Sequence, residues 1–366
     1  MRDVFELMKQ QGHEQVTFFR HEGTGLEAIV AIHNTTMGPA LGGCRMQPYE
    51  STDAALEDVL RLSRGMTFKC GVVDVDFGGG KVVIKGNPNE DKSPEMFRAL
   101  GRFIGGMNGR FFTGTDMGTN PEDFVHSARE SSSFVGLPTA HGGSGDTSIP
   151  TAYGVLQGLR ATAKHMWGSE SLDGKSFAIQ GLGKVGYRLI ELLINENARM
   201  MISDINAAYI ERAKALIPEH LLIKVVAPDI IHSEEVDFYV PCALGGVIND
   251  TTIGQLRCKA IVGSANNQLK EERHGEIIYS KGIHYAPDYL VNAGGLIQVA
   301  DELKGYNPER VLEQTRSIYN TLLQIYKFSE QKQMCTSEAA DHLVLERIKK
   351  SADLKTILIG SLKKSY

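Results

Sequence analysis

The feature that most constrains the fold is a glycine-rich turn in the middle of the chain. Residues 181–186, Gly-Leu-Gly-Lys-Val-Gly, form a complete G-x-G-x-x-G pattern. The apolar run SFAIQ (176–180) precedes the turn, an amphipathic segment begins at Lys184, and Asp204 ends the next apolar run. A strand, a tight turn and a helix in this order, followed by an acid about 20 residues later, are typical of a βαβ unit that binds a dinucleotide. We therefore expect a parallel sheet with helices on its faces.

Each glycine of this turn has a separate physical task. Gly181 permits the tight turn, Gly183 lets backbone amides approach a pyrophosphate, and Gly186 allows close packing of helix on strand. Asp204 would accept hydrogen bonds from the ribose hydroxyls and repel a 2′-phosphate, which favours NAD over NADP. A glycine cluster that binds nothing is the alternative, and the strand, helix and acid in register argue against it. The cofactor-binding residues predicted here are Gly181, Leu182, Gly183, Lys184, Val185, Gly186 and Asp204.

The rest of the chain divides into two parts. A chain of 366 residues is too long for one ordinary core and suits two domains. The first ~140 residues favour an α/β or α+β layer, and residues 131–148, rich in Ser, Gly and Pro, indicate a loop or domain crossing. Periodicity predicts strands at 26–34, 81–86, 111–117, 176–180, 199–204, 236–241, 259–265 and 283–290, and helices at 53–69, 93–109, 151–168, 184–198 and 207–216. The last ~60 residues are expected to be helical.

Composition points to small-molecule chemistry. The net charge of −5 and pI near 6.1 give no electrostatic case for nucleic acid or an anionic membrane. No stretch approaches the ~20 apolar residues of a membrane span. Five widely spaced cysteines without a C-x-x-C pattern favour reduced thiols and a cytoplasmic location. We expect no metal site, because paired His and Cys spacings are missing, and we place His13, His141 and His274 at the surface.

Three ionisable residues in the first half are candidates for catalysis. Lys69 and Lys81 lie in apolar, glycine-rich surroundings, and Asp116 lies in the run TGTDMGT. The glycines at 78–80 let substrate approach closely, and a partly desolvated lysine beside a second cation gives up its proton more easily. Lys69 could then stay charged and hold a carboxylate, while Asp116 could exchange protons with an amine. Singly, each could be a surface charge or a turn residue; together, in a chain with a dinucleotide turn, they favour a catalytic site.

Several stretches carry a resemblance to a known family. They are GPALGGCRM (38–46), GMTFKC (65–70), DVDFGGGKVVI (74–84), NGRFFTGTDMGTNPEDF (108–124), TAYGV (151–155), PCALGGVIND (241–250), GSANNQL (263–269) and APDYLVNAGGLIQVADEL (286–303). With the glycine turn, the chain resembles the glutamate/leucine/phenylalanine/valine dehydrogenase superfamily, most closely the bacterial phenylalanine dehydrogenases. The resemblance spans nearly the whole chain. It implies a substrate domain at 1–140, completed by C-terminal helices at about 332–366, a Rossmann-like NAD domain at 141–331, and an active site in the cleft between them.

The resemblance also implies residue roles. Lys81 matches the general base that activates water for attack on an imine, and Asp116 the acid that assists proton transfer at the amine. Lys69 matches the lysine that pairs with the substrate carboxylate, helped by backbone near Gly43 and by Asn267. Arg45, Thr151, Ala265, Asn266 and Asn267 match positions on the nicotinamide side. The implied reaction is NAD-dependent, reversible oxidative deamination to a 2-oxo acid and ammonium, favoured at alkaline pH because Lys81 must be neutral.

The side-chain pocket decides which amino acid reacts. By resemblance Leu41, Gly114, Leu296 and Val299 line an apolar pocket. Leucine-type enzymes carry alanine where this chain has Gly114 and valine where it has Leu296, so phenylalanine is expected, as part of its catabolism. The alternatives are a leucine/valine dehydrogenase and a broader aromatic amino-acid dehydrogenase. Such a preference is graded, because one methylene is worth only ~1–3 kcal/mol. Gly114 could also be a plain turn glycine. The family forms homo-oligomers, often octamers; a silent NAD-binding or assembly protein is the alternative from another class.

Overall fold

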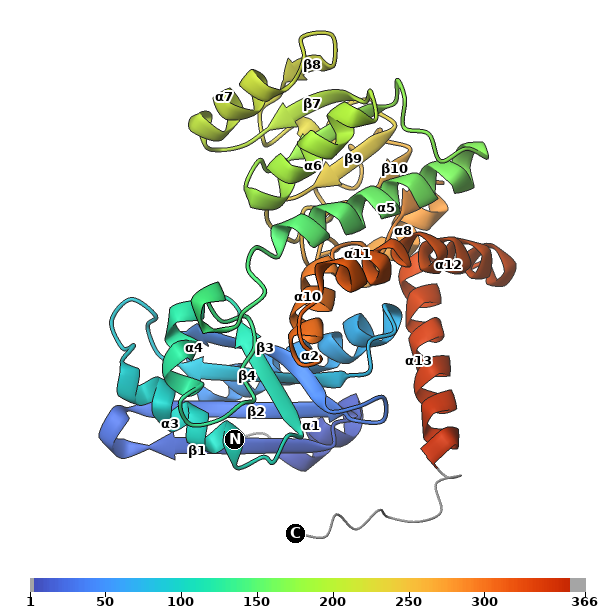
Figure 1. The fold of residues 1–366 in the computed structure, drawn as a ribbon. Helices are drawn as coiled ribbons and strands as arrows, with labels where there is room; N and C mark the ends of the chain where they lie inside the picture. The colour runs from blue at the N-terminus through green and yellow to red at the C-terminus, as the bar shows by residue number, and fades with distance from the viewer. Residues whose placement is uncertain (1–2, 356–366) are drawn as a thin grey trace. The chain divides into compact units, whose positions relative to one another are not determined.

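The protein, described here as a computed structural model over residues 3–355, consists of two compact α/β units (Figure 1). Over the described residues, the first unit is built from 3–145, 299–306 and 344–355, and the second from 146–298 and 307–343. The chain therefore passes from one unit to the other at 145/146, 298/299, 306/307 and 343/344. From the sequence we placed the first boundary near 140 and returned the chain to the first domain near 332. Part of that predicted C-terminal segment, 356–366, lies outside the described residues.

The first unit contains a five-stranded sheet in the order β1-β2-β4-β3-β5. β1 and β2 pair antiparallel, as do β2 and β4, whereas β3 runs parallel to both β4 and β5. Because β3, β4 and β5 share one direction, groups at their ends gather at one edge of the sheet. The strands are β1 (Gln15–His21), β2 (Leu26–Asn34), β3 (Ala40–Gln47), β4 (Gly78–Lys85) and β5 (Phe111–Thr115).

Helices cover both faces of this sheet. On one face Leu56 and Leu60 of α2 pack in one cluster with Val83 of β4. On the other face Phe97 of α3 and Phe124 of α4 pack in one cluster with Val82 of β4. The N-terminal cap of α3 is Ser93, whose Oγ accepts from the Met96 N–H at 3.1 Å. The helices are α1 (Val4–Gln11), α2 (Thr52–Val72), α3 (Pro94–Gly105) and α4 (Pro121–Ser127), with short 3-10 turns at Glu22–Thr24 and Thr139–His141.

Glycine brings α2 unusually close to the central strand β4. A Cβ placed on Gly79 would lie 2.1 Å from the Thr67 amide nitrogen and 2.6 Å from the Ser63 carbonyl oxygen. Any side chain at position 79 would push the helix off the sheet. Lys69 lies two residues after Thr67, and Lys81 lies two residues after Gly79. The contact therefore fixes the backbone from which both lysine side chains extend.

The second unit is the parallel, doubly wound half that the glycine turn predicts. Its six-stranded sheet has the order β11-β10-β9-β6-β7-β8, and every strand pair in it is parallel. The order reverses at β6, the strand that feeds the glycine turn, and ligands of such sheets bind at this reversal. The strands are β6 (Ser176–Gln180), β7 (Arg199–Ser203), β8 (Leu222–Val225), β9 (Phe238–Pro241), β10 (Ala260–Ile261) and β11 (His284–Tyr285).

Nine helices follow the linker, counted over the described residues. The strand predicted at 283–290 is wrong beyond its first residues: β11 covers only His284–Tyr285, and Asp288 begins a short helix after Pro287. The helical C-terminal stretch is confirmed through residue 355. The helices are α5 (Ser148–Trp167), α6 (Lys184–Asn195), α7 (Ala207–Leu216), α8 (Arg273–Ser280), α9 (Asp288–Val291), α10 (Gly294–Glu302), α11 (Pro308–Arg316), α12 (Ile318–Lys332) and α13 (Thr336–Lys355).

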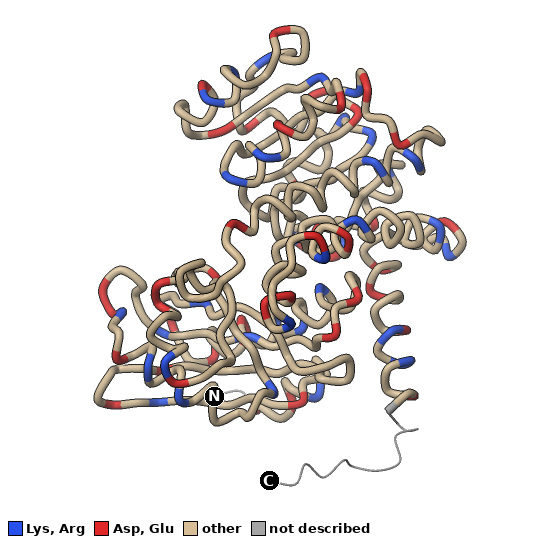
Figure 2. The backbone as a smooth tube through the Cα atoms, in the orientation of Figure 1, with Lys and Arg blue, Asp and Glu red and all other residues tan. Residues whose placement is uncertain are grey.

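Charged residues of both signs are interspersed along the chain in each unit (Figure 2). Between residues 3 and 355, none of the helices combines the length and apolarity needed to cross a bilayer.

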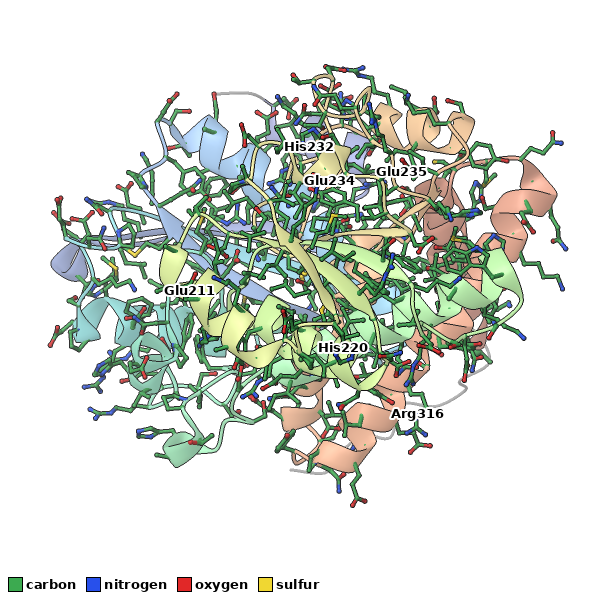
Figure 3. All side chains as sticks on the ribbon, turned by 90° about the horizontal axis from the view of Figure 1, so that it is seen from above. Glu211, His220, His232, Glu234, Glu235 and Arg316 are labelled. Atoms are coloured by element: carbon green, nitrogen blue, oxygen red, sulfur yellow. The ribbon has the colours of Figure 1, made fainter. Side chains whose placement is uncertain are left out.

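His232, Glu234 and Glu235, labelled in Figure 3, lie at a 3-10 turn (Ile231–Ser233). His232 bonds Gln255 at 3.0 Å, and Glu234 pairs with Lys224 at 2.8 Å. Within the described part of the chain, no group of three or more His, Cys, Asp or Glu side chains could hold a metal ion.

His13 and His274, which we expect at the surface from the sequence, are both buried. His274 is 0% exposed and contacts Asp250 at 3.3 Å. His13 is 8% exposed, with Nε2 2.8 Å from Ser63 Oγ, and packs edge-on against His33 at 4.9 Å between ring centroids. The surface placement of His13 and His274 is therefore wrong: Leu60 and Ser63 of α2 contact the His13 ring, and Asp250 and the Glu271 N–H contact the His274 ring. Burial, together with the neighbouring His33, lowers the pKa of His13 to about 4, and burial lowers that of His33 as well.

Acid should destabilise the first unit through this histidine pair. His13 stays neutral in the folded protein down to about pH 4 but binds a proton near pH 6.5 when unfolded. Its contribution is therefore complete above pH 6.5 and is lost as pH falls toward 4, a loss on the order of 3 kcal/mol. Urea unfolding midpoints at pH 7 and pH 5 measure it. His13→Asn should flatten the pH dependence, whereas His21→Asn, at an exposed position, should not; equal slopes in all three proteins would contradict the prediction.

Candidate active site

The first unit brings together two of the predicted catalytic groups. Lys81 Nζ, on β4, lies 2.8 Å from Asp116 Oδ2, one residue past the end of β5. The Lys81 side chain is 7% exposed and that of Asp116 25%. Burial alone would raise the pKa of Asp116, but the charge and hydrogen bond of Lys81, joined by Arg45, outweigh burial and hold that pKa below its ordinary value. The pair is an amine and an anionic carboxylate held in contact, an arrangement suited to passing a proton.

Gly43 lies directly beside this pair. A Cβ at Gly43 would lie 2.9 Å from Asp116 Cβ and 3.1 Å from Lys81 Nζ. On the neighbouring strand Gly114 is the register partner of Gly43. A Cβ on Gly114 would lie 2.8 Å from the Val135 carbonyl oxygen, so glycine at both positions lets Lys81, Asp116 and the backbone at Val135 pack closely around β3 and β5. Leu41, two residues before Gly43 on β3, is 2% exposed and pairs with Gly79 and Phe112.

Lys69 lies in the last turn of α2, whereas Lys81 lies on β4 and Asp116 just after β5. The end of that helix is closed from the far end of the chain, because Arg347 Nη1 donates to the carbonyl oxygens of Gly71 at 2.6 Å and Val72 at 3.0 Å. A cation at this terminus satisfies carbonyls that the helix itself leaves open. The Gly79 contact and Arg347 together restrain the helix turn that carries Lys69.

Arg45 is held by carboxylates of the first unit. Its Nε donates to Asp116 Oδ2 at 3.1 Å, and its Nη1 donates to Asp58 Oδ2 at 3.0 Å. The same Asp58 accepts from Tyr49 Oη at 2.8 Å and from Arg61 Nη2 at 2.9 Å. By resemblance Arg45 is expected on the cofactor side, whereas Asp58 has no predicted role. An acid three residues before an arginine on a helix is too common a pattern to reveal this network.

The glycine turn of the second unit has the geometry that the motif predicts. Gly181 has φ +100°, and a Cβ on Gly186 would lie 2.0 Å from the Gly181 carbonyl oxygen. Gly183 caps α6 with no side-chain hydrogen bond, and a Cβ there would have nothing within 4 Å. Asp204 follows β7, and its Oδ2 accepts from the Leu182 N–H at 2.6 Å. The open amide terminus at Gly183 fits a phosphate-bearing cofactor, since a helix N-terminus attracts anions.

A second group of polar residues follows β10. Asn267 has φ +52°, and the Asn266 Oδ1 accepts from Asn292 Nδ2 at 2.8 Å. Asn292 is 5% exposed, and its Oδ1 is a buried acceptor with no hydrogen-bond partner within residues 3–355. Thr151, on α5, adjoins this region, because a Cβ on Gly295 would lie 3.0 Å from Thr151 Oγ1. The orphaned acceptor fits an amide N–H of a bound nicotinamide group.

The predicted site residues thus fall in both units. Lys69, Lys81, Asp116, Gly43, Leu41, Gly114 and Arg45 belong to the first, as does Val299 within α10. Thr151, the glycine turn with Lys184 and Val185, Asp204, Ala265, Asn266, Asn267 and Leu296 belong to the second. Asp58 is a polar residue of these regions that sequence reasoning missed. The unpaired Oδ1 of Asn292 leaves no sequence signal, since it depends on what packs around the side chain.

Comparison with known proteins identifies the family. Residues 13–133 match the family described as Glu/Leu/Phe/Val dehydrogenase, dimerisation domain. Residues 142–228 and 212–354 match Glutamate/Leucine/Phenylalanine/Valine dehydrogenase. A phenylalanine dehydrogenase of Thermoactinomyces intermedius is 60% identical over 359 residues, 98% of each chain. A leucine dehydrogenase of Bacillus subtilis (strain 168) is 48% identical over 348 residues, 95% of this chain and 94% of its own.

The fold agrees with these matches. The crystal structure of L-tryptophan dehydrogenase from Nostoc punctiforme is similar with a TM-score of 0.87 and 41% identity, covering 96% of this chain and 100% of that one. The family resemblance read from the sequence is confirmed, as is the fold class with a Rossmann-like unit beside an N-terminal α/β unit. Its matches span both units, and the chain belongs to the glutamate/leucine/phenylalanine/valine dehydrogenase family of amino-acid dehydrogenases.

Proposed function

We propose that the protein catalyses the NAD-dependent, reversible oxidative deamination of L-phenylalanine to phenylpyruvate and ammonium. The observation that carries the proposal is the buried contact of Lys81 with Asp116 beside Gly43. It supplies an amine and an anionic carboxylate in contact, a pair that can exchange protons, in a chain 60% identical to a phenylalanine dehydrogenase. A protein that only binds NAD would have no use for a buried amine paired with a carboxylate.

The chain's own residues would divide the work. Lys69 pairs with the substrate carboxylate, helped by the backbone near Gly43 and by Asn267, and so orients the amino acid. A bound nicotinamide would supply the acceptor for the hydride of the substrate Cα. Lys81, in its neutral form, takes a proton from the water that attacks the imine carbon. Asp116 exchanges a proton with the substrate nitrogen as the carbinolamine collapses to the 2-oxo acid and ammonium. Thr151, Arg45 and Ala265 to Asn267 would lie toward the nicotinamide.

NAD in preference to NADP is supported by Asp204. Its carboxylate follows β7 and braces the glycine turn through the Leu182 N–H. A carboxylate there can accept from ribose hydroxyls and repels a 2′-phosphate. The neighbouring Arg212 also contacts this turn, donating to the Leu182 carbonyl oxygen at 3.1 Å, with its guanidinium over the Tyr187 ring. Because Arg212 already stacks on an aromatic ring, we assign the selection of NAD over NADP to Asp204.

Two glycines of the turn should respond differently to the same substitution. Gly186→Ala forces a methyl onto the Gly181 carbonyl oxygen at 2.0 Å and should destabilise folding by about 2 kcal/mol or more. Gly183→Ala meets open space, so thermal unfolding should change little, but the methyl occupies the approach of the phosphates. We expect NAD affinity to fall at least tenfold, as measured by calorimetry or by quenching of Trp167 fluorescence. Unchanged affinity in Gly183→Ala would show that phosphates bind elsewhere.

The choice of phenylalanine rests on the side-chain pocket proposed from Leu41, Gly114, Leu296 and Val299. A methyl at Gly114 would lie 2.8 Å from the Val135 carbonyl oxygen, so alanine there must move the 133–136 segment as well as add bulk. We expect Gly114→Ala with Leu296→Val to raise the leucine-to-phenylalanine ratio of kcat/KM by about 10- to 100-fold. Ile297→Val, at a buried position on the same helix, is the control. A ratio unchanged by the double substitution would contradict this pocket.

We also propose that the protein acts in the cytoplasm as a homo-oligomer, an octamer by family resemblance. The five cysteines are free, and four of them are buried, as suits a reducing compartment. Strand β1 is the outer strand of its sheet, and Phe18 on it is 49% exposed. An open strand edge of this kind can pair with another chain, and the matched family is described as a dimerisation domain over these residues. Light scattering measures the mass.

A substrate panel tests the proposed reaction. NADH formation at alkaline pH is followed with L-phenylalanine, L-tyrosine, L-tryptophan, L-leucine and L-valine, with NADP as the alternative cofactor. Highest kcat/KM with phenylalanine and NAD is the expected result. Preference for leucine or valine would assign the protein to the branched-chain group. Binding of NAD without turnover of any amino acid would favour a silent binding protein.

A further inference from the structure

A chain of alternating charges runs from the catalytic pair to the surface of α2. Lys81 contacts Asp116 at 2.8 Å, Asp116 contacts Arg45 at 3.1 Å, Arg45 contacts Asp58 at 3.0 Å, and Asp58 contacts Arg61 at 2.9 Å. The side chains of Arg45 and Asp58 are only 17% and 14% exposed, so water screens their charges weakly. Arg61 is 56% exposed and marks the outer end. Charges at one end of such a chain act on the other.

These linked ion pairs explain how Lys81 can act as a base although it contacts an anionic carboxylate. A base must lose its proton, yet an anionic carboxylate in contact with a lysine favours the protonated amine. Arg45 counters this effect, because it binds the same oxygen, Asp116 Oδ2, that Lys81 contacts. Two cations on one oxygen atom lie within about 6 Å and repel each other. The more completely Arg45 pairs with Asp116, the less Asp116 retains the proton on Lys81.

Asp58 competes with Asp116 for the guanidinium of Arg45. With Lys81 neutral, Arg45 and Arg61 carry two positive charges, and Asp58 and Asp116 carry two negative charges, so these four groups are balanced. Asp58 is held for this purpose by Tyr49 Oη at 2.8 Å as well as by Arg61. Burial opposes ionisation of Asp58, but the hydrogen bonds of Tyr49 and Arg61 and the charge of Arg45 keep its pKa below the ordinary value. It is therefore a fixed anion at neutral pH.

We propose that Asp58 is a positioning residue that acts through Arg45 to set how readily Lys81 gives up its proton. The inference rests on the proposed reaction and deepens it, since it names what regulates the base. Asp58 itself need not touch substrate or cofactor. Its effect travels along three contacts between side chains, each at hydrogen-bond distance.

Other titratable groups lie on the elements that pack on β4 and in the surroundings of Cys44. β3 contributes Cys44, whose pKa burial raises, so the thiol stays neutral. α2 contributes Lys69 beyond its contact with β4, β2 contributes the buried His33, and Lys92 pairs with Asp123 at 2.6 Å. These groups are the same in all the variants below. Differences between variants therefore report on Arg45 and Asp58 alone.

Two substitutions should move the pH dependence in opposite directions. Asp58→Asn frees Arg45 to pair with Asp116, so the acidic limb of kcat/KM for L-phenylalanine oxidation should move to lower pH, by about 0.5–1 unit. On that limb the rate at fixed pH rises about three- to tenfold. Arg45→Gln leaves Asp116 to Lys81 and should move the limb to higher pH by about 1 unit. Arg102→Gln, which also removes one positive charge but pairs with Glu130 far along α3, is the control.

A second measurement does not depend on turnover. Competitive acetylation with acetic anhydride across pH, with the Lys81 peptide quantified by mass spectrometry, reports the proton on Lys81 directly in the unliganded protein. Opposite shifts of the Lys81 profile in Asp58→Asn and Arg45→Gln are expected. If Arg45→Gln does not fold, Arg61→Gln should give a smaller shift to higher pH, because Arg61 is half exposed.

The outcomes separate the two ideas. Profiles of Asp58→Asn that coincide with those of Arg102→Gln, or shifts of Asp58→Asn and Arg45→Gln in the same direction, would overturn the positioning role. Shifted acetylation profiles in a protein that turns over no amino acid would refute the proposed function and leave the coupling of Asp58 to Lys81 standing. A fall in kcat of Asp58→Asn at every pH, without any shift, would show a structural role only and would also overturn the proposal.

Discussion

Lys81→Ala is expected to lower kcat for L-phenylalanine oxidation by about 10²- to 10⁴-fold, the range for loss of a positioned general base. The variant should still fold, because Asp116 keeps Arg45 as a partner at 3.1 Å and no unpaired buried carboxylate is left. NAD affinity should be unchanged, since the glycine turn belongs to the other unit. Stopped-flow formation of NADH with saturating substrate measures the effect, and circular dichroism checks the fold.

The matched control is Lys85→Ala on the same strand. Lys85 is 33% exposed and lies 3.8 Å from Glu27, away from the catalytic pair. We expect its kcat to stay within about twofold of wild type, since surface ion pairs contribute little. A Lys81→Ala variant that kept more than a tenth of the wild-type rate would remove Lys81 from the role of base, whatever the substrate profile.

Gly79→Ala should have the largest effect on stability in the first unit. The added methyl would meet the Thr67 nitrogen at 2.1 Å, the Thr67 Oγ1 at 2.2 Å and the Ser63 carbonyl oxygen at 2.6 Å. Backbone atoms cannot yield as a flexible side chain does, so α2 must move off the sheet, at a cost of about 3 kcal/mol or more. That is a large fraction of the stability of an ordinary domain. Soluble expression and guanidinium unfolding measure it.

Gly65→Ala tests whether the effect depends on position. Gly65 lies in α2 itself, and a Cβ there has nothing within 4 Å. Replacing a helical glycine by alanine at an open site should raise the free energy of unfolding by up to about 1 kcal/mol. Gly79→Ala and Gly65→Ala therefore have opposite signs. Equal unfolding midpoints for Gly79→Ala and wild type would mean that α2 does not approach β4 as closely as described.

Local patterns in the sequence predicted most elements of the fold. The apolar run at 26–34, the capped helix that begins after Ser93 and the strand–turn–helix at 176–195 all lie where periodicity and glycine placement put them. The segment 283–290 failed because Pro287 stops a strand and Asp288 starts a helix within a single apolar run. Strands β1 and β3 were not singled out as elements, because β1 mixes polar with apolar residues and β3 reads as a glycine-rich loop.

For the site, the sequence named the reacting groups but not their support. Lys81 and Asp116 could be named from their surroundings and from family resemblance. That Arg45 divides itself between Asp116 and Asp58 depends on the register of β3 against α2, which no short pattern encodes. His13 was misplaced for a similar reason. Its neighbours in sequence are polar, whereas the atoms that bury it come from Leu60 and Ser63 in another element.

The four crossings of the chain between the two units limit how this protein could be recombined. Neither unit corresponds to one uninterrupted piece of gene, because 299–306 and 344–366 return to the first unit after the second has been made. Exchange of a whole unit with a relative would need several joints, one of them inside α13, whose Arg347 closes the helix of Lys69. A ribosome must also release nearly the full chain before the first unit can be completed. Selection on substrate choice would therefore act through single substitutions and not through shuffled domains.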